Sequence, residues 1–169
     1  FASSKLSEYS FIDAGCGNGW IIRRIAEDPK CFKAIGVDGS KNMIDKAKRL
    51  DVRNKYYCED LLTWIPNEKA DIIHSMEVFY YFENPGNLIK HINNNWIKSG
   101  GRLIMGIDFY MENKASHSWQ KECGISIMKL YSEIEWKKIF KNAGLNKVES
   151  WRHGEGKDWG GTLIVTGVH

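Results

Sequence analysis

The chain has 169 residues, of which 43% are hydrophobic and 27% are charged, and its formal net charge is +3. A chain of this length suits one domain that buries roughly 70% of the surface its unfolded form would expose. No apolar run approaches the about 20 residues that a membrane-spanning helix needs. We therefore expect a single domain over residues 1–169, placed in the cytoplasm and not in a membrane.

Two classes of partner are disfavoured by the composition. The four cysteines lie far apart, with no C-x-x-C pair and no histidine at zinc-ligand spacing, so we expect reduced thiols and no metal site. Lys and Arg are spread along the chain rather than gathered in one block, which makes a nucleic-acid partner unlikely. Nothing in the sequence indicates an oligomeric state.

Short runs rich in β-branched and aromatic residues recur along the chain and predict strands. The seven predicted strands are residues 9–14, 34–38, 55–58, 71–76, 102–107, 147–151 and 162–168. Segments with helical spacing lie between the first five, which predicts βαβ crossovers and a mostly parallel sheet in an α/β fold. The last two strands have no helix between them and should form an antiparallel C-terminal hairpin.

Two further segments stand out in the second half of the chain. Ser132 and Glu135 have the spacing of a capping box ahead of an apolar stripe over residues 136–143, which predicts a helix. Residues 108–131 form a long irregular stretch, and loops of that length are usually lids or binding elements.

A glycine loop lies directly after the first strand and before the first helix. It reads D-x-G-x-G-x-G, with Asp13, Gly15, Gly17 and Gly19, and glycines let the backbone turn sharply and approach a ligand closely. A dinucleotide-binding loop would carry a third glycine where Trp20 stands, so a nicotinamide cofactor is disfavoured.

This loop resembles the first motif of class I S-adenosylmethionine-dependent methyltransferases, and the later motifs match the small-molecule branch of that family. The resemblance implies a Rossmann-like three-layer sandwich with a seven-stranded sheet, S-adenosylmethionine as cofactor and S-adenosylhomocysteine as product. It also implies that the loop wraps the methionine end of the cofactor. The implied binding residues in the loop are Asp13, Gly15, Cys16, Gly17, Asn18 and Gly19.

Two acidic residues follow the next strands. Asp38 ends the second strand, where a carboxylate can accept hydrogen bonds from both ribose hydroxyls, while Ser40 can cap the following helix. Asp60 follows the third strand at the position where the family binds the adenine amine, and Leu61 would lie against the ring. The resemblance adds further cofactor residues on these and the fourth strand, namely Gly39, Met43, Ser75 and Met76.

The acceptor pocket should lie outside the carboxyl ends of the fourth and fifth strands. Tyr81 stands where many relatives carry a histidine, and no D/N/S-P-P-Y/F tetrapeptide of base-methylating enzymes is present. His74 lies inside a strand and is expected to pack in the core, and no catalytic residue is assigned. The candidate lining residues are Tyr81, Asp108, Phe109, Tyr110, His117, Trp119 and Trp159.

The favoured function is methyl transfer to a small-molecule acceptor by in-line displacement, which needs alignment and exclusion of water rather than a covalent nucleophile. One alternative is a non-catalytic S-adenosylmethionine-binding or regulatory module, and a less favoured one is an NAD-dependent oxidoreductase. Only twelve residues precede Asp13, so we expect either that the N-terminal lid of related domains is short or missing, or that residues 108–131 do part of its work.

Overall fold

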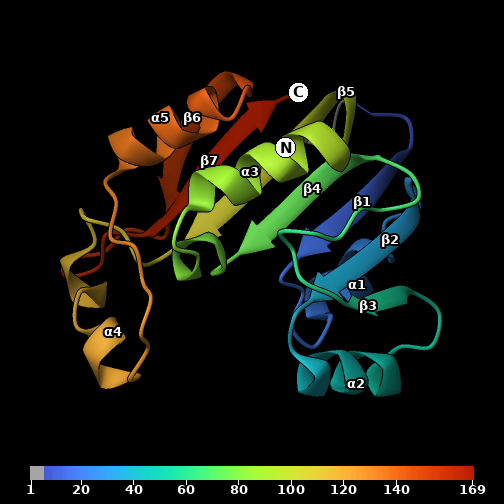
Figure 1. Ribbon diagram of the computed structural model, residues 1–169, viewed down its shortest axis with the longest axis horizontal. Coiled ribbons are helices and arrows are strands. Elements are labelled where there is room, and N and C mark those ends of the chain that lie inside the picture. The colour runs from blue at the N-terminus through green and yellow to red at the C-terminus, as the bar shows by residue number, and fades with distance from the viewer. Residues whose placement is uncertain (1–5) are drawn as a thin grey trace.

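The computed structural model describes residues 6–169 and contains a seven-stranded sheet (Figure 1). The strands are β1 (Tyr9–Ala14), β2 (Cys31–Asp38), β3 (Lys55–Cys58), β4 (Ala70–Met76), β5 (Ile97–Ile107), β6 (Asn146–His153) and β7 (Thr162–Val168). Their order is β3-β2-β1-β4-β5-β7-β6. The first five strands pair in parallel, and β7 runs antiparallel between β5 and β6, which confirms the predicted mostly parallel sheet with its antiparallel hairpin.

Helices cover both faces of this sheet. They are α1 (Trp20–Ile25), α2 (Lys41–Leu50), α3 (Pro85–Asn95), α4 (Trp119–Glu122) and α5 (Glu133–Asn142), with short 3-10 turns η2 (Phe79–Tyr81) and η3 (Lys114–Ser116). Figure 1 shows α3 and α5 side by side on the near face, and these two helices contact each other. Within residues 6–169, none of these helices has the length and apolar composition to cross a membrane.

The hydrophobic core is divided between the two faces by the alternation of strand side chains. Ile12 of β1 packs in a cluster with Trp136 of α5, whereas its neighbour Phe11 packs in a second cluster with Ile22 of α1 and Ile44 of α2. Successive side chains of a strand point to opposite faces, so one buried strand supplies both layers. The result is the predicted three-layer α/β sandwich.

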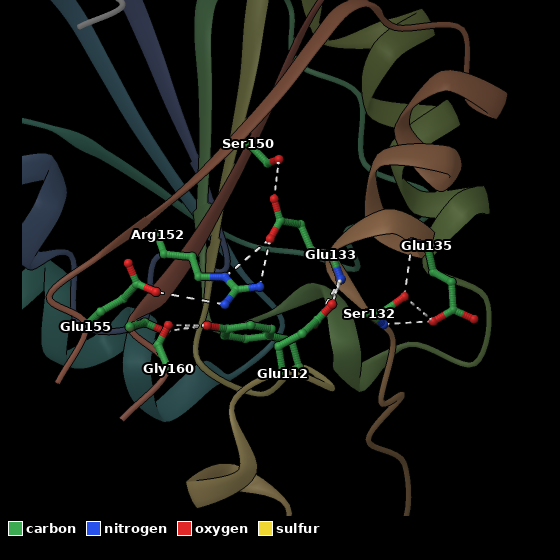
Figure 2. A network of polar contacts seen from close by, with 10 residues as sticks. Glu112, Ser132, Glu133, Glu135, Ser150, Arg152, Glu155 and Gly160 are labelled. Carbon is green, nitrogen blue, oxygen red and sulfur yellow. Dashed lines mark hydrogen bonds and ion pairs between the residues drawn. The ribbon is translucent and has the colours of Figure 1, made fainter. Parts of the chain in front are cut away.

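The helix α5 is fixed at its N-terminus by a polar network (Figure 2). The predicted capping box is present, because the Ser132 hydroxyl accepts from the N–H of Glu135 and the Glu135 carboxylate accepts from the N–H of Ser132. The Glu133 carboxylate accepts from the Ser150 hydroxyl at 2.7 Å and from the Arg152 guanidinium at 2.9 Å. These contacts join α5 to β6.

The long segment of residues 108–131 packs against the C-terminal hairpin. Its regular elements are η3 and α4. In Figure 1, α4 lies on the side of β6 and β7, whereas α2 lies on the side of β3. The buried hydroxyl of Tyr110 donates to the carbonyls of Gly160 and Gly161, in the loop that joins β6 and β7. The backbone N–H of Lys129 donates to the carbonyl of Tyr80 at 2.8 Å, which fixes the end of the segment beside η2.

Candidate functional site

The glycine loop between β1 and α1 turns back onto the end of β2. The N–H groups of Gly15 and Cys16 both donate to the carbonyl of Val37, at 2.8 and 3.0 Å. Gly15 has a φ of +78°, and a Cβ there would lie 2.3 Å from the Val78 side chain. Gly17 has a φ of +53°, but a Cβ there would meet no atom within 4 Å. The loop is therefore closely packed at Gly15 and open at Gly17.

Asp38 connects this loop to the start of α2. Its Oδ2 atom accepts from the N–H of Gly17 at 2.9 Å, and its Oδ1 atom accepts from the N–H of Ser40 at 2.7 Å. The Ser40 hydroxyl accepts from the N–H of Met43, which confirms Ser40 as the cap of α2. Each carboxylate oxygen retains further acceptor capacity. Asp38 is thus held in place with lone pairs left for a ligand.

A pocket of about 620 Å³ opens at the carboxyl ends of β1, β2, β3 and β4. Crevices at this edge of an open parallel sheet, where the strand order reverses, are the usual ligand sites of α/β folds. The volume falls in the range of small-molecule sites, roughly 300–1,000 Å³. The predicted cofactor residues that line it are Gly15, Gly17, Asp38, Gly39, Met43, Asp60, Leu61 and Met76.

The other predicted cofactor residues lie outside this lining and support its wall. The Ser75 hydroxyl donates to the carbonyl of Ala14 at 2.8 Å. Cys16 is buried in the core, and burial raises the pKa of its thiol, so it stays neutral. Gly19 packs against the Tyr56 ring, and the carbonyl of Asn18 accepts from Arg23 at 2.7 Å.

The remaining residue of the motif, Asp13, lies in strand β1, is 3% exposed, and contacts the neighbouring strand β4. Its Oδ1 atom lies 2.8 Å from Nδ1 of His74 on the neighbouring strand β4. This contact gives His74 a polar partner and places it beside Phe11, whose ring stacks on the imidazole. Asp13 therefore orders the base of the loop.

Among the acceptor candidates, only Tyr81 belongs to the pocket lining. Asp108 lies next to the pocket residue Glu77, to which its N–H donates. Tyr110 is buried and bonded to the hairpin loop, and Nε2 of His117 lies 3.0 Å from the carbonyl of Met111, beside a separate hollow. Three further aromatic candidates also lie outside the pocket lining, namely the buried Phe109 and the mutually packed Trp119 and Trp159.

The structure brings residues into the pocket that the sequence motifs do not indicate. The most notable is Glu77, which directly follows β4 and has a left-handed backbone with a φ of 57°. Burial raises the pKa of its carboxyl to about 7. A carboxylate placed directly after a strand at the reversal point of the sheet is the signal that marks it. The remaining additional lining residues are Cys58, Glu59, Val78 and Phe82.

The pocket fits an adenosyl cofactor by several observations of its own. Asp38 has lone pairs free beside the open Gly17, as a ribose diol requires. Asp60 uses Oδ1 to accept from the N–H of Leu62 at 2.9 Å, which leaves Oδ2 for an exocyclic amine. The Oδ1 atom of Asn18, next to Gly17 but outside the lining, is buried without a partner in the described part of the chain.

Comparison with known proteins identifies the family. Residues 1–150 match the family model described as "Methyltransferase domain", and the chain belongs to this family. The predicted class, the S-adenosylmethionine-dependent methyltransferases with S-adenosylmethionine as cofactor, is thereby confirmed. Trans-aconitate 2-methyltransferase of Rhizobium rhizogenes is 30% identical over 94 residues, which are 56% of this chain and 36% of the relative. Malonyl-[acyl-carrier protein] O-methyltransferase 2 of Ilyobacter polytropus is 28% identical over 123 residues, which are 69% of this chain and 47% of the relative.

Solved structures share the fold over nearly the whole chain. A chain of the Haloferax volcanii complex between the Trm112 methyltransferase activator and a methyltransferase superposes with a TM-score of 0.85 at 25% identity, covering 99% of this chain and 86% of that one. Magnesium protoporphyrin IX methyltransferase of Synechocystis with bound SAH gives a TM-score of 0.74 at 19% identity, covering 99% and 76%. This chain spans less than half the length of the two curated relatives named above.

Proposed function

We propose that the chain transfers a methyl group from S-adenosylmethionine to a small-molecule acceptor. The observation that carries the proposal is the bond between Asp38 and the N–H of Gly17, because it places a carboxylate and an open glycine loop on the same wall of the pocket. The names of the curated relatives support a small acceptor, since they specify trans-aconitate and malonyl-acyl carrier protein.

In this proposal each side of the pocket holds one part of the cofactor. Asp38 accepts from the ribose hydroxyls, Asp60 accepts from the adenine amine, and Leu61 packs on the ring. The loop around Gly17 encloses the methionine end near Met76. When bound, S-adenosylmethionine supplies a methyl group made electrophilic by a positively charged sulfur. The chain contributes alignment of the acceptor and exclusion of water by its apolar walls.

Titration calorimetry tests the cofactor assignment. We expect S-adenosylmethionine and S-adenosylhomocysteine to bind in the micromolar range and NAD not to bind. Asp38→Ala should weaken binding at least tenfold, which corresponds to about 1.4 kcal/mol. Asp45→Ala is the matched control, because Asp45 lies on α2 and its carboxylate pairs with the exposed Lys41. Unchanged affinity in the Asp38 variant would remove the ribose assignment, and binding of NAD alone would favour an oxidoreductase.

A second candidate is that the chain acts as the catalytic part of a two-protein assembly. It is supported by the superposition on the Haloferax volcanii complex, which covers 99% of this chain. This candidate predicts low solubility or weak cofactor binding for the isolated chain and a gain of both on addition of an activator protein. Full cofactor affinity of the isolated chain would count against it.

A third alternative is a non-catalytic module. Such a module would bind the cofactor but would not methylate any acceptor.

A further inference from the structure

Two acidic residues, Glu77 and Asp108, directly follow the adjacent strands β4 and β5. The Oε1 atom of Glu77 accepts from the backbone N–H of Asp108 at 2.5 Å, and its Oε2 atom accepts from the Tyr80 hydroxyl at 2.6 Å. The N–H of Glu77 donates to the carbonyl of Gly106 on β5 at 2.9 Å. Backbone and side chain are both fixed by these bonds, and the side chain forms part of the pocket lining.

The backbone of Glu77 is strained at this position. Its φ of 57° lies in the left-handed region, which non-glycine residues seldom adopt. Strain of this kind persists only where surrounding contacts over-determine it, and it concentrates at functional sites. The bonds to β5 and to Tyr80 supply those contacts, so the fold maintains an unfavourable backbone in order to present this carboxylate.

The pocket is acidic although the chain as a whole is positively charged. Of the charged residues in its lining, Asp38 and Asp60 are assigned to the cofactor, which leaves Glu59 and Glu77, and the lining found within residues 6–169 includes no Lys, Arg or His. An acceptor that carries several carboxylates needs cationic partners, because unpaired like charges in a binding site are strongly unfavourable. The lining therefore disfavours an acceptor such as trans-aconitate.

Asp108 adds a second indication of the ligand's chemistry. Its Oδ1 atom is buried and accepts no hydrogen bond from any residue that the structure describes. Buried polar atoms nearly always have a partner, and an unpaired carboxylate oxygen costs more than a neutral one. Asp108 itself lies outside the pocket lining, so a donor bound beside Glu77 reaches this atom only if the Asp108 side chain turns toward the pocket.

We propose that the methyl acceptor is an amine and that Glu77 takes its proton, an inference that rests on the proposed function. An ammonium group offers three donors, and the Glu77 carboxylate in the pocket lining can accept from it. Transfer of one proton to Glu77 frees the nitrogen lone pair. The nitrogen then bonds to the methyl carbon as the carbon–sulfur bond breaks, and the bonding pair stays on sulfur. The methylated ammonium departs and Glu77 releases its proton to solvent.

The groups that face Glu77 suit this role. Burial raises the pKa of its carboxyl to about 7, the hydrogen bond from Tyr80 lowers it, and the negative charge of Asp108 raises it. Tyr80 stays neutral because burial and the charge of Glu77 raise the pKa of its phenol, and the Tyr81 hydroxyl lies 3.4 Å from it. A base whose pKa lies near the working pH is best placed to take and return a proton.

Binding of matched probes tests the amine assignment separately from the cofactor assignment. The chain is saturated with S-adenosylhomocysteine and titrated with phenethylamine, phenethyl alcohol, phenylacetate and trans-aconitate. We expect the amine to bind at least tenfold more tightly than the other three. If S-adenosylhomocysteine binds but the amine binds no better than the others, the amine assignment falls and the proposed function stands. If S-adenosylhomocysteine does not bind, both fall.

Variants then test the role of Glu77. Glu77→Gln keeps the size of the side chain but removes its charge, and the affinity of the chain saturated with S-adenosylhomocysteine for the amine should fall about tenfold. If the Glu77 variant folds poorly, Asp108→Asn takes its place. It removes the negative charge beside Glu77 and should also lower amine affinity. Glu83→Gln is the matched control, because its carboxylate pairs with Lys129 outside the pocket. Equal amine affinity in the wild type and in the Glu77 and Asp108 variants would overturn the proposal.

Discussion

The Nδ1 atom of His74 lies 2.8 Å from Oδ1 of Asp13, across the paired strands β4 and β1. Asp13 is the first residue of the glycine-loop motif and is 3% exposed. The two residues are direct neighbours in the strand register, so the loop begins from a fixed point in the sheet. Asp13 thus holds the start of the loop to strand β4, whereas Asp38 lines the pocket.

We expect Asp13→Ala to destabilise the fold by about 1–3 kcal/mol, because it leaves a largely buried ring nitrogen of His74 without its partner. Urea denaturation of the ligand-free chain measures this change. Asp45→Ala, which removes an exposed carboxylate paired with Lys41, should cause a much smaller loss. Equal losses in the two variants would contradict the anchoring role of Asp13.

Gly15 and Gly17 should respond differently to alanine. Both need a left-handed backbone, which costs a non-glycine residue about 1–2 kcal/mol. A Cβ at Gly15 also lies 2.3 Å from Val78, whereas one at Gly17 meets nothing within 4 Å. We therefore expect Gly15→Ala to lower the melting temperature far more than Gly17→Ala. Gly17→Ala should mainly weaken cofactor binding, which calorimetry measures. Adding Val78→Ala should partly restore the Gly15 variant, and no restoration would show that the clash is not the cause.

Much of the fold could be predicted from local patterns, because each strand alternates and each helix has its own apolar stripe. The starts of β2 and β5 could not, because these two strands begin three and five residues before the predicted positions 34 and 102. The strand β5 begins at Ile97, earlier than predicted, because Ile97 pairs with Ala70 while Arg102 pairs with Ile72. The extra residues form an irregularity that includes Gly100, with a φ of 74°. Such a bulge depends on pairing with a distant strand, and the polar residues around it carry no strand signal.

The same division applies to the site. The position of the glycine loop and of Asp38 beside the pocket could be predicted, because a short motif between a strand and a helix fixes their surroundings. Glu77 has one sequence signal, its place directly after a strand, but its left-handed backbone and its contact with Asp108, which is distant in sequence, depend on the tertiary fold. Tyr110 and His117 have side chains typical of a pocket, but long-range packing of residues 108–131 directs them elsewhere.

The raised pKa of Glu77 predicts how stability depends on pH. The carboxyl pKa rises from its ordinary 4.5 to about 7 on folding, so the native state binds more protons than the unfolded state between these values. Stability should therefore fall as pH rises through this window. Glu77→Gln removes the titration, and its stability relative to the wild type should rise across the window by on the order of 3 kcal/mol. Chemical denaturation at both ends of the window measures the effect. A constant difference would show that Glu77 is not buried as described.

A variant at Tyr110 tests whether residues 108–131 have a structural role or form part of the pocket. Its hydroxyl donates to the carbonyls of Gly160 and Gly161, and the Arg152 guanidinium lies 5.5 Å from its ring centre. Tyr110→Phe removes the donor but keeps the packed ring, so we expect a loss of about 1 kcal/mol in the free energy of unfolding. Calorimetry should show unchanged affinity for S-adenosylhomocysteine, because Tyr110 lies outside the pocket lining.

Tyr81→Ala is the informative counterpart, since Tyr81 lines the pocket and is 40% exposed. It should change probe binding with little loss of stability. The reverse pattern, with ligand affinity sensitive to Tyr110 and not to Tyr81, would mean that the segment closes over the pocket when the cofactor binds.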